Sequence, residues 1–146
     1  MKIICIGRNY ADHAKEMKSA VPTEPLYFLK PDTAILREGD FYYPSFTKDL
    51  HFECELIVKI DRVGKHIDKA FAHKYYSEFS LGIDFTARDI QEQCKANGLP
   101  WEKAKGFDSS AAISNQWINK ADLDLETAEF TFFQNNELKQ TGHPRD

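Results

Sequence analysis

The segment HFECELIVKI, residues 51–60, restricts the fold more than any other stretch of this chain. Side chains alternate across a β-strand, so the strand predicted from Phe52 to Ile60 has one apolar and one polar face. The polar face carries two acids, Glu53 and Glu55, whose Cα atoms lie roughly 6.5–7 Å apart on an extended strand. The apolar face, fit for a core, carries Phe52, Cys54, Leu56, Val58 and Ile60.

Two like charges held side by side repel each other unless a positive charge lies between them. A divalent cation such as Mg²⁺ or Mn²⁺ would serve, because these ions prefer carboxylate oxygens and water. A solvated strand face is the alternative, and for this motif alone it is the commoner case. Asp84 favours the metal site, because it ends an apolar strand just before a predicted helix, a common place for a ligand-binding acid.

Arg88 and Gln91 lie three residues apart on that predicted helix and so share a face. Together with the three acids they would suit a chelated keto acid. A solvated helix surface is the alternative for this pair, and it would be preferred without Asp84 beside them.

The rest of the chain mixes strands and helices without regular βαβ spacing, which predicts an α+β fold with a largely antiparallel sheet. Thr86, followed by Asp89, is a variant of the capping box that begins helices. Asn135 and Asn136 predict a hairpin turn between strands 129–134 and 137–140. Other strands are expected over 2–6, 26–29 and 79–85, and helices over 11–19, 70–77 and 86–96.

Length and composition bound the class of protein. No repeat or linker divides the 146 residues, so we expect one domain over 1–146. The net charge of -4 argues against a nucleic-acid partner, and no apolar run is long enough to span a membrane. No signal-like core follows Met1, which predicts a cytoplasmic protein. Cys5, Cys54 and Cys94 are far apart and odd in number, so we expect reduced packing residues.

His13 and Glu16 lie three residues apart in the segment GRNYADHAKEM, residues 7–17. This spacing places them on one face of a helix. They could be an acid–base pair or the polar face of a surface helix, and the spacing alone favours the surface helix.

Five motifs occur in a characteristic order along the chain. They are GRNYADH at 7–13, FLKP at 28–31, HFECE at 51–55, DFTARDIQ at 84–91 and WEKAKGFD at 101–108. In this order they closely resemble the fumarylacetoacetate hydrolase family, in particular its short members of the acylpyruvase and oxaloacetate decarboxylase type. The resemblance covers essentially the whole chain.

The resemblance implies a mixed β-sandwich roll with a few short helices, a Mg²⁺ or Mn²⁺ cofactor and a homodimer. It also implies that the family's core continues beyond residue 146, so we expect this domain to lack its C-terminal part. Carried over by position, the implied metal ligands are Glu53, Glu55 and Asp84. The implied catalytic residues are His13 and Glu16 on a mobile lid, together with Lys105; Arg88, Gln91 and Lys30 match groups that line the substrate pocket.

The expected function is metal-dependent hydrolysis of a carbon–carbon bond in acylpyruvate-type β-diketo acids through a metal-bound enolate. His13, oriented by Glu16, would take a proton from the attacking water. Decarboxylation of oxaloacetate is the first alternative, and isomerisation of an unsaturated keto diacid of the 2-hydroxyhepta-2,4-diene-1,7-dioate type is another. A non-catalytic module that binds a metal or an anion is the alternative from a different class.

Overall fold

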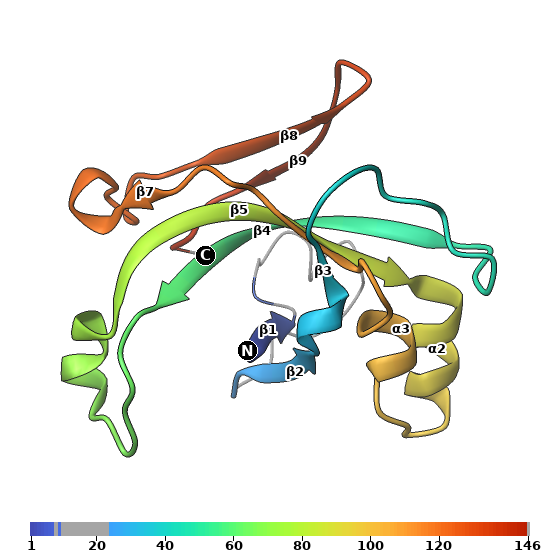
Figure 1. The fold of residues 1–146 in the computed structure, drawn as a ribbon, viewed down its shortest axis with the longest axis horizontal. Coiled ribbons are helices and arrows are strands. Elements are labelled where there is room, and N and C mark those ends of the chain that lie inside the picture. Colours follow the sequence, from blue (N-terminus) through green and yellow to red (C-terminus); the bar gives the residue numbers. More distant parts are fainter. Residues whose placement is uncertain (8, 10–23, 146) are drawn as a thin grey trace.

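The computed structural model describes residues 1–7, 9 and 24–145, and a long antiparallel pair of strands crosses its centre (Figure 1). Strand β4 (Leu50–Ile60) pairs with β5 (Tyr76–Ala87) in a register that sets Glu53 opposite Asp84. The sheet order is β3-β6-β5-β4, so β4 lies at one end. The remaining strands of this sheet are β3 (Ile35–Leu36), β6 (Ala111–Ile113) and β7 (Ile118–Asn119), which pairs with β5.

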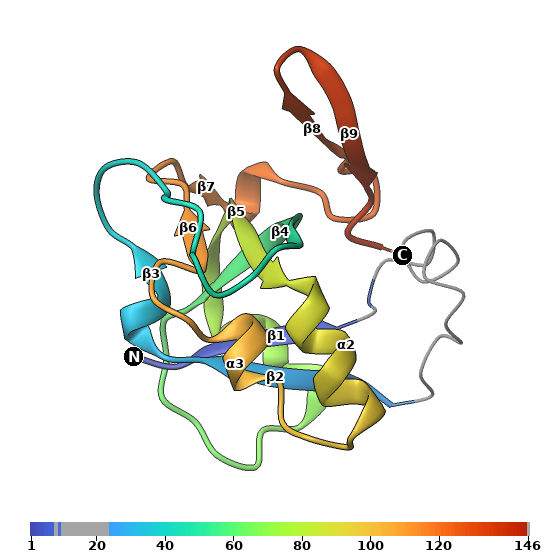
Figure 2. The same cartoon turned by 90° about the vertical axis from the view of Figure 1, so that its right-hand side faces the viewer.

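Two smaller antiparallel sheets lie on opposite sides of the β4–β5 pair (Figures 1 and 2). One is formed by β1 (Ile3–Gly7) and β2 (Leu26–Lys30), the other by β8 (Phe130–Gln134) and β9 (Glu137–Gly142). Helices α2 (Arg88–Ala96) and α3 (Glu102–Lys105) lie on the side of β1 and β2. The described residues also form three 3₁₀ turns: η1 (Asp32–Ala34), η2 (Lys69–Lys74) and η3 (Lys120–Asp122).

This architecture confirms the expected mixed β-roll with a few short helices. Strands β3 and β6 are parallel, whereas the pairs β1–β2, β4–β5, β5–β6, β5–β7 and β8–β9 are antiparallel. Among the described residues, no helix is long and apolar enough to cross a membrane.

The apolar face of β4 packs against the β8–β9 hairpin. The rings of Phe52 and Phe132 lie 5.3 Å apart. The side-chain amide of Gln140 accepts a hydrogen bond from the Cys54 N–H at 2.8 Å and donates one to the Cys54 carbonyl at 2.7 Å. Farther along the strand Val58 and Ile60 are exposed, so the hairpin covers only the first half of this face.

Charged side chains are among the best-buried groups of the described chain. Lys30 and Lys105 are 3% and 2% exposed, and Asp84 is 7% exposed. Buried charges are rare unless they are paired. The interior therefore contains a polar centre, on the face of β4–β5 that looks toward α3 and β2.

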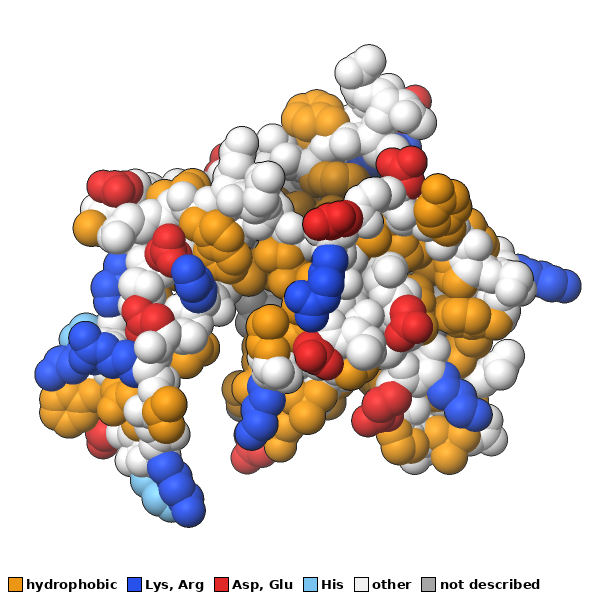
Figure 3. All heavy atoms as spheres, in the orientation of Figure 1, with side chains coloured by type: hydrophobic (Ala, Val, Ile, Leu, Met, Phe, Trp, Pro, Cys, Tyr) orange, Lys and Arg blue, Asp and Glu red, His pale blue; other side chains and the backbone are white. Residues whose placement is uncertain are grey.

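The surface seen in Figure 3 mixes acidic, basic and apolar side chains, and neither sign of charge dominates that face. The exposed apolar groups include Ile4 and Ile6 of β1, which lie opposite Leu29 and Tyr27 of β2.

Two predicted helix boundaries are wrong, because sheet pairing overrides the local signals. Residues 70–77 were expected to be helical, but the 3₁₀ turn η2 ends at Lys74 and Tyr76 already pairs with Ile60. Thr86 is not a helix cap: it is a fully buried residue of β5, opposite His51. The helix begins at Arg88 instead, without a side-chain cap. The carboxylate of Asp89 accepts hydrogen bonds from Thr47 Oγ1 at 2.6 Å and from the Lys48 N–H at 3.0 Å.

Other local predictions are confirmed. Asn135 and Asn136 form the two-residue turn of the β8–β9 hairpin with φ angles of 53° and 64°, as a type I′ turn requires. All three cysteines are free; Cys54 and Cys94 are buried and Cys5 is half-buried. The helix predicted over 11–19 lies outside the described residues.

We predict that Gln140→Ala loosens the β8–β9 hairpin without unfolding the rest of the chain. The two hydrogen bonds between the Gln140 side chain and the Cys54 main chain are lost, each with a net contribution of about 0.5–1.5 kcal/mol. Amide hydrogen exchange in residues 130–142 should accelerate roughly tenfold, and exchange in β5 should not change. Thr141→Ala, an exposed position on the same strand, is the control. Equal exchange rates in the two variants would contradict the docking role of Gln140.

Candidate active site

The polar centre is built around two carboxylates that face each other across β4 and β5. Glu53 and Asp84 occupy opposite positions of the strand pair, which brings their side chains to the same face of the sheet. The ammonium of Lys105, from α3, lies between them. Its Nζ is 2.7 Å from Glu53 Oε2 and 2.8 Å from Asp84 Oδ2. A cation of the protein thus joins the two acids.

Two further cations complete the charge arrangement. Lys30 Nζ, at the end of β2, lies 2.8 Å from Asp84 Oδ1. Arg88 Nη2, at the start of α2, lies 2.5 Å from Glu53 Oε1, and its Nη1 donates to Gln91 Oε1 at 2.5 Å. Arg88 and Gln91, both buried, therefore point toward the carboxylates and not into solvent.

These contacts determine the protonation of the paired groups. Burial alone would raise the pKa of Glu53, but Lys105 and Arg88 lower it to about 2. Burial would likewise lower the pKa of Lys105, but Asp84 and Glu53 raise it above its ordinary value. Burial lowers the pKa of Lys30, with Asp84 opposing that shift. Glu53 and Lys105 are consequently ionised near neutral pH.

Glu55 differs from its neighbours. Burial and the neighbouring charges of Glu53 and Asp84 together raise its pKa to about 8, and Lys105 offsets only part of this rise. Within the described residues this carboxyl forms no ion pair. Glu55 therefore lies beside two carboxylates, and the described part of the chain gives it no ion-pair partner.

The composition of this centre fits a hard divalent cation. Three carboxyl groups supply the oxygen ligands that Mg²⁺ and Mn²⁺ prefer, and Glu55 is the one that forms no ion pair with any described residue. Asp84 Oδ1 is buried and lies 2.8 Å from Lys30 Nζ. As the side chains stand, no three acidic, histidine or cysteine groups of the described residues are gathered around one point. Lys105 occupies the space between Glu53 and Asp84 instead.

The structure therefore brings together seven of the nine residues expected at the site: Glu53, Glu55, Asp84, Lys105, Arg88, Gln91 and Lys30. The other two, His13 and Glu16, lie outside the described residues. Two contributors were not anticipated. The ring of Phe28 lies under Lys105 Nζ at 5.1 Å, and Ser110 contacts Lys30. Phe28 stands in the FLKP motif and could have been inferred, whereas Ser110 has no sequence signal.

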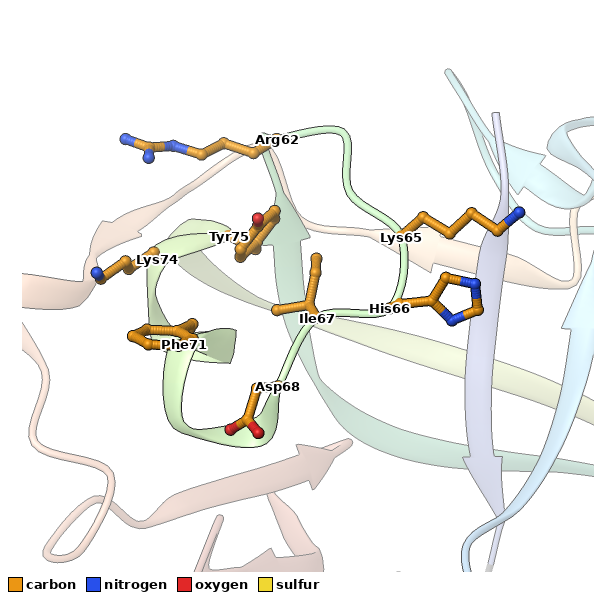
Figure 4. A pocket seen from close by; sticks show the side chains of 8 residues that line it. All are labelled: Arg62, Lys65, His66, Ile67, Asp68, Phe71, Lys74 and Tyr75. Atoms are coloured by element: carbon orange, nitrogen blue, oxygen red, sulfur yellow. The ribbon is translucent and has the colours of Figure 1, made fainter.

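A separate surface pocket of about 470 Å³ lies at the far end of the β4–β5 pair (Figure 4). Ile67, Phe71 and Tyr75 lie near its middle, while Arg62 and Lys65 extend outward in different directions. None of the seven site residues within the described ranges lines this pocket.

Residues 2–146 match the family model described as fumarylacetoacetate (FAA) hydrolase C-terminal. The chain belongs to the fumarylacetoacetate hydrolase family. It is 44% identical over 141 residues to the mitochondrial oxaloacetate tautomerase of Mus musculus, covering 96% of this chain and 64% of that protein. It is 38% identical over 144 residues to the mitochondrial oxaloacetate decarboxylase of Dictyostelium discoideum, covering 97% of this chain and 66% of that protein.

Solved structures share the fold as well. The fumarylpyruvate hydrolase of Pseudomonas aeruginosa, solved in complex with Mn²⁺ and pyruvate, superimposes with a TM-score of 0.87 at 31% identity. That match covers 97% of this chain and 64% of the other. The chain thus spans about two thirds of the length of the proteins that it resembles.

We predict that the metal-free protein becomes less stable as the pH rises from about 5 to 8, and that Glu55 causes part of this loss. Its pKa is about 8 in the folded chain, against an ordinary value of 4.5. The folded state therefore binds the proton more tightly than the unfolded state between these values, and its stability falls as that proton is lost. Thermal unfolding should show a flatter pH dependence for Glu55→Gln, with a higher melting temperature than the parent at pH 8.

Glu78→Gln is the matched control, because Glu78 lies at the other end of β5 and pairs with Lys59. Parallel pH profiles for the parent and Glu55→Gln would show that Glu55 has an ordinary pKa.

Proposed function

We propose that this chain carries the active site of a metal-dependent enzyme that cleaves a carbon–carbon bond in acylpyruvate-type β-diketo acids by hydrolysis. The observation that carries the proposal is the crowding of Glu55 beside Glu53 and Asp84, with Lys105 bridging the latter two. Such an assembly costs stability in a domain that only needs to fold. It becomes useful where a cation and a developing negative charge must be accommodated together.

Glu53, Glu55 and Asp84 would hold Mg²⁺ or Mn²⁺ as the cofactor. When bound, the cation supplies a Lewis acid for the adjacent carboxylate and oxo oxygens of an α-keto acid. The relative from Pseudomonas aeruginosa, solved in complex with Mn²⁺ and pyruvate, supports both the ion and the class of ligand.

The protein's own residues suit the remaining tasks. Lys105 stays protonated because Asp84 and Glu53 raise its pKa, so it can donate a hydrogen bond to an oxygen that becomes negative as the pyruvate enolate leaves. Arg88 and Gln91 provide donors for a substrate carboxylate. His13, oriented by Glu16, would take the proton from the attacking water; this assignment rests on the family resemblance alone.

A second function has specific support. The relative from Mus musculus is named an oxaloacetate tautomerase, and keto–enol exchange in oxaloacetate also proceeds through an enolate next to a carboxylate. Decarboxylation of oxaloacetate, the activity named for the relative from Dictyostelium discoideum, forms an enolate too but needs no attacking water. Isomerisation of an unsaturated keto diacid is a further candidate. A homodimer and a cytoplasmic location remain proposals; both relatives named here are mitochondrial.

We predict metal-dependent release of pyruvate from acetylpyruvate by the purified chain, measured with a coupled dehydrogenase. Asp84→Asn should lower this rate at least a hundredfold and remove its response to added Mg²⁺ or Mn²⁺, because a ligand and a negative charge are lost. Glu78→Gln, on the same strand, should keep both. A response to metal that survives in Asp84→Asn would rule out Asp84 as a ligand, and no pyruvate release by the parent chain would leave the binding-module alternative.

The role of His13 separates hydrolysis from the oxaloacetate reactions. His13→Ala should suppress acetylpyruvate hydrolysis roughly a hundredfold, because general-base catalysis contributes about 10²–10⁴. Decarboxylation of oxaloacetate, followed by loss of its ultraviolet absorbance, should fall much less. Equal losses for the two substrates would contradict a water-activating role.

A further inference from the structure

Lys30 is surrounded by oxygen atoms of the protein. Its side chain is 1% exposed, and Nζ lies 2.8 Å from Asp84 Oδ1. The same ammonium donates to Ser110 Oγ at 3.0 Å, to the Ser110 carbonyl at 3.1 Å, to the Phe85 carbonyl at 3.5 Å and to the Lys105 carbonyl. An ammonium has three N–H donors. These five protein oxygens account for all of them.

One of these oxygens belongs to the residue that bridges the acids. Lys105 is the last residue of α3, where a helix leaves its carbonyls without helical partners. Lys30 donates to the Lys105 carbonyl, and Ser110 Oγ does so as well at 2.9 Å. Lys30 and Ser110 thus hold the main chain of Lys105 from one side, while Glu53 and Asp84 hold its ammonium from the other.

Lys30 also constrains the orientation of Asp84. The two oxygens of this carboxylate are divided between two lysines, Oδ1 to Lys30 and Oδ2 to Lys105. Rotation of the carboxylate would break one contact or the other. A main-chain hydrogen bond links the same residues, because the Phe85 N–H donates to the Ser110 carbonyl at 2.9 Å.

We propose that Lys30 is a positioning residue: it fixes the backbone of Lys105 and the carboxylate of Asp84, and it does not contact the substrate. The inference rests on the proposed function and refines the pocket-lining role that the family resemblance implies for Lys30. A substrate-binding lysine would need an unused donor and a path to the ligand. The burial of Lys30 and its five oxygen neighbours provide neither.

Ser110 offers a sharp test, because it shares the Lys105 carbonyl with Lys30 but has no charge with which to attract a keto acid. We expect Lys30→Met to lower kcat for acetylpyruvate by tenfold to a hundredfold, since small displacements of reacting groups reduce rates by about this much. Ser110→Ala should lower kcat severalfold. In both variants KM should stay within twofold of the parent, and Lys103→Met, an exposed lysine of the same helix, should change neither constant.

A double variant further distinguishes a positioning role of Lys30 from a substrate-binding role. If Lys30 and Ser110 act through the same carbonyl, the loss in kcat for Lys30→Met with Ser110→Ala should be close to that of Lys30→Met alone, and so smaller than the product of the single losses by about the Ser110→Ala factor. A tenfold rise in KM for Lys30→Met with kcat retained would overturn the proposal. So would losses that simply multiply.

Hydrogen exchange gives a readout that does not depend on activity. Amides of residues 105–110 should lose protection at least tenfold in Lys30→Met and in Ser110→Ala, and should keep it in Lys103→Met. If the chain shows no activity on keto acids, the proposed function fails, and this measurement still decides whether Lys30 holds Lys105. Should Lys30→Met not fold, Ser110→Ala carries the test alone; unchanged protection there would overturn the proposal.

Discussion

The structure depends on the opposition of Glu53 and Asp84 across two strands. Two carboxylates 4 Å apart repel by roughly 4 kcal/mol at an effective dielectric constant near 20, and burial adds to the cost. The neighbouring elements each supply a cation to this pair: β2 gives Lys30, α3 gives Lys105 and α2 gives Arg88. The packing of two helices and a small sheet on this face is therefore tied to neutralising two charges as well as to burying apolar surface.

The same constraint connects stability with chemistry. The cations that Glu53 and Asp84 require for folding are also the groups that could stabilise an enolate, whereas Glu55 is left without a partner among the described residues. A divalent ion bound by Glu55 would offset the repulsion from Glu53 and Asp84 that helps to raise its pKa to about 8. Hydrolysis, tautomerisation and decarboxylation of keto acids could all use such an ion.

Local sequence patterns predicted which helices and strands form better than they predicted the residues at which these begin and end. Alternation in residues 51–60 identified β4, and two adjacent asparagines identified the β8–β9 turn, because both signals act within a few residues. The boundary at Thr86 could not be predicted, since the extension of β5 follows from pairing with His51, far along the chain. The same holds for the site. Glu53 and Glu55 were evident on one strand, but the register that sets Asp84 opposite Glu53, and the approach of Ser110 to Lys30, arise only from tertiary packing.

The docking of Gln140 on Cys54 has a consequence for how copies of this chain meet one another. Among the described strands, β4 is the edge strand of its sheet, and the main-chain groups along an edge strand can pair with a strand from another molecule. The amide of Gln140 presents one acceptor and one donor to Cys54, in the manner of a single residue of a neighbouring strand. The N–H and the carbonyl of Cys54 are therefore already hydrogen-bonded and could not pair with an incoming strand. The Gln140 side chain thus occupies the main-chain groups of Cys54, which stands between Glu53 and Glu55 in the sequence, and leaves them unavailable to a strand of another molecule.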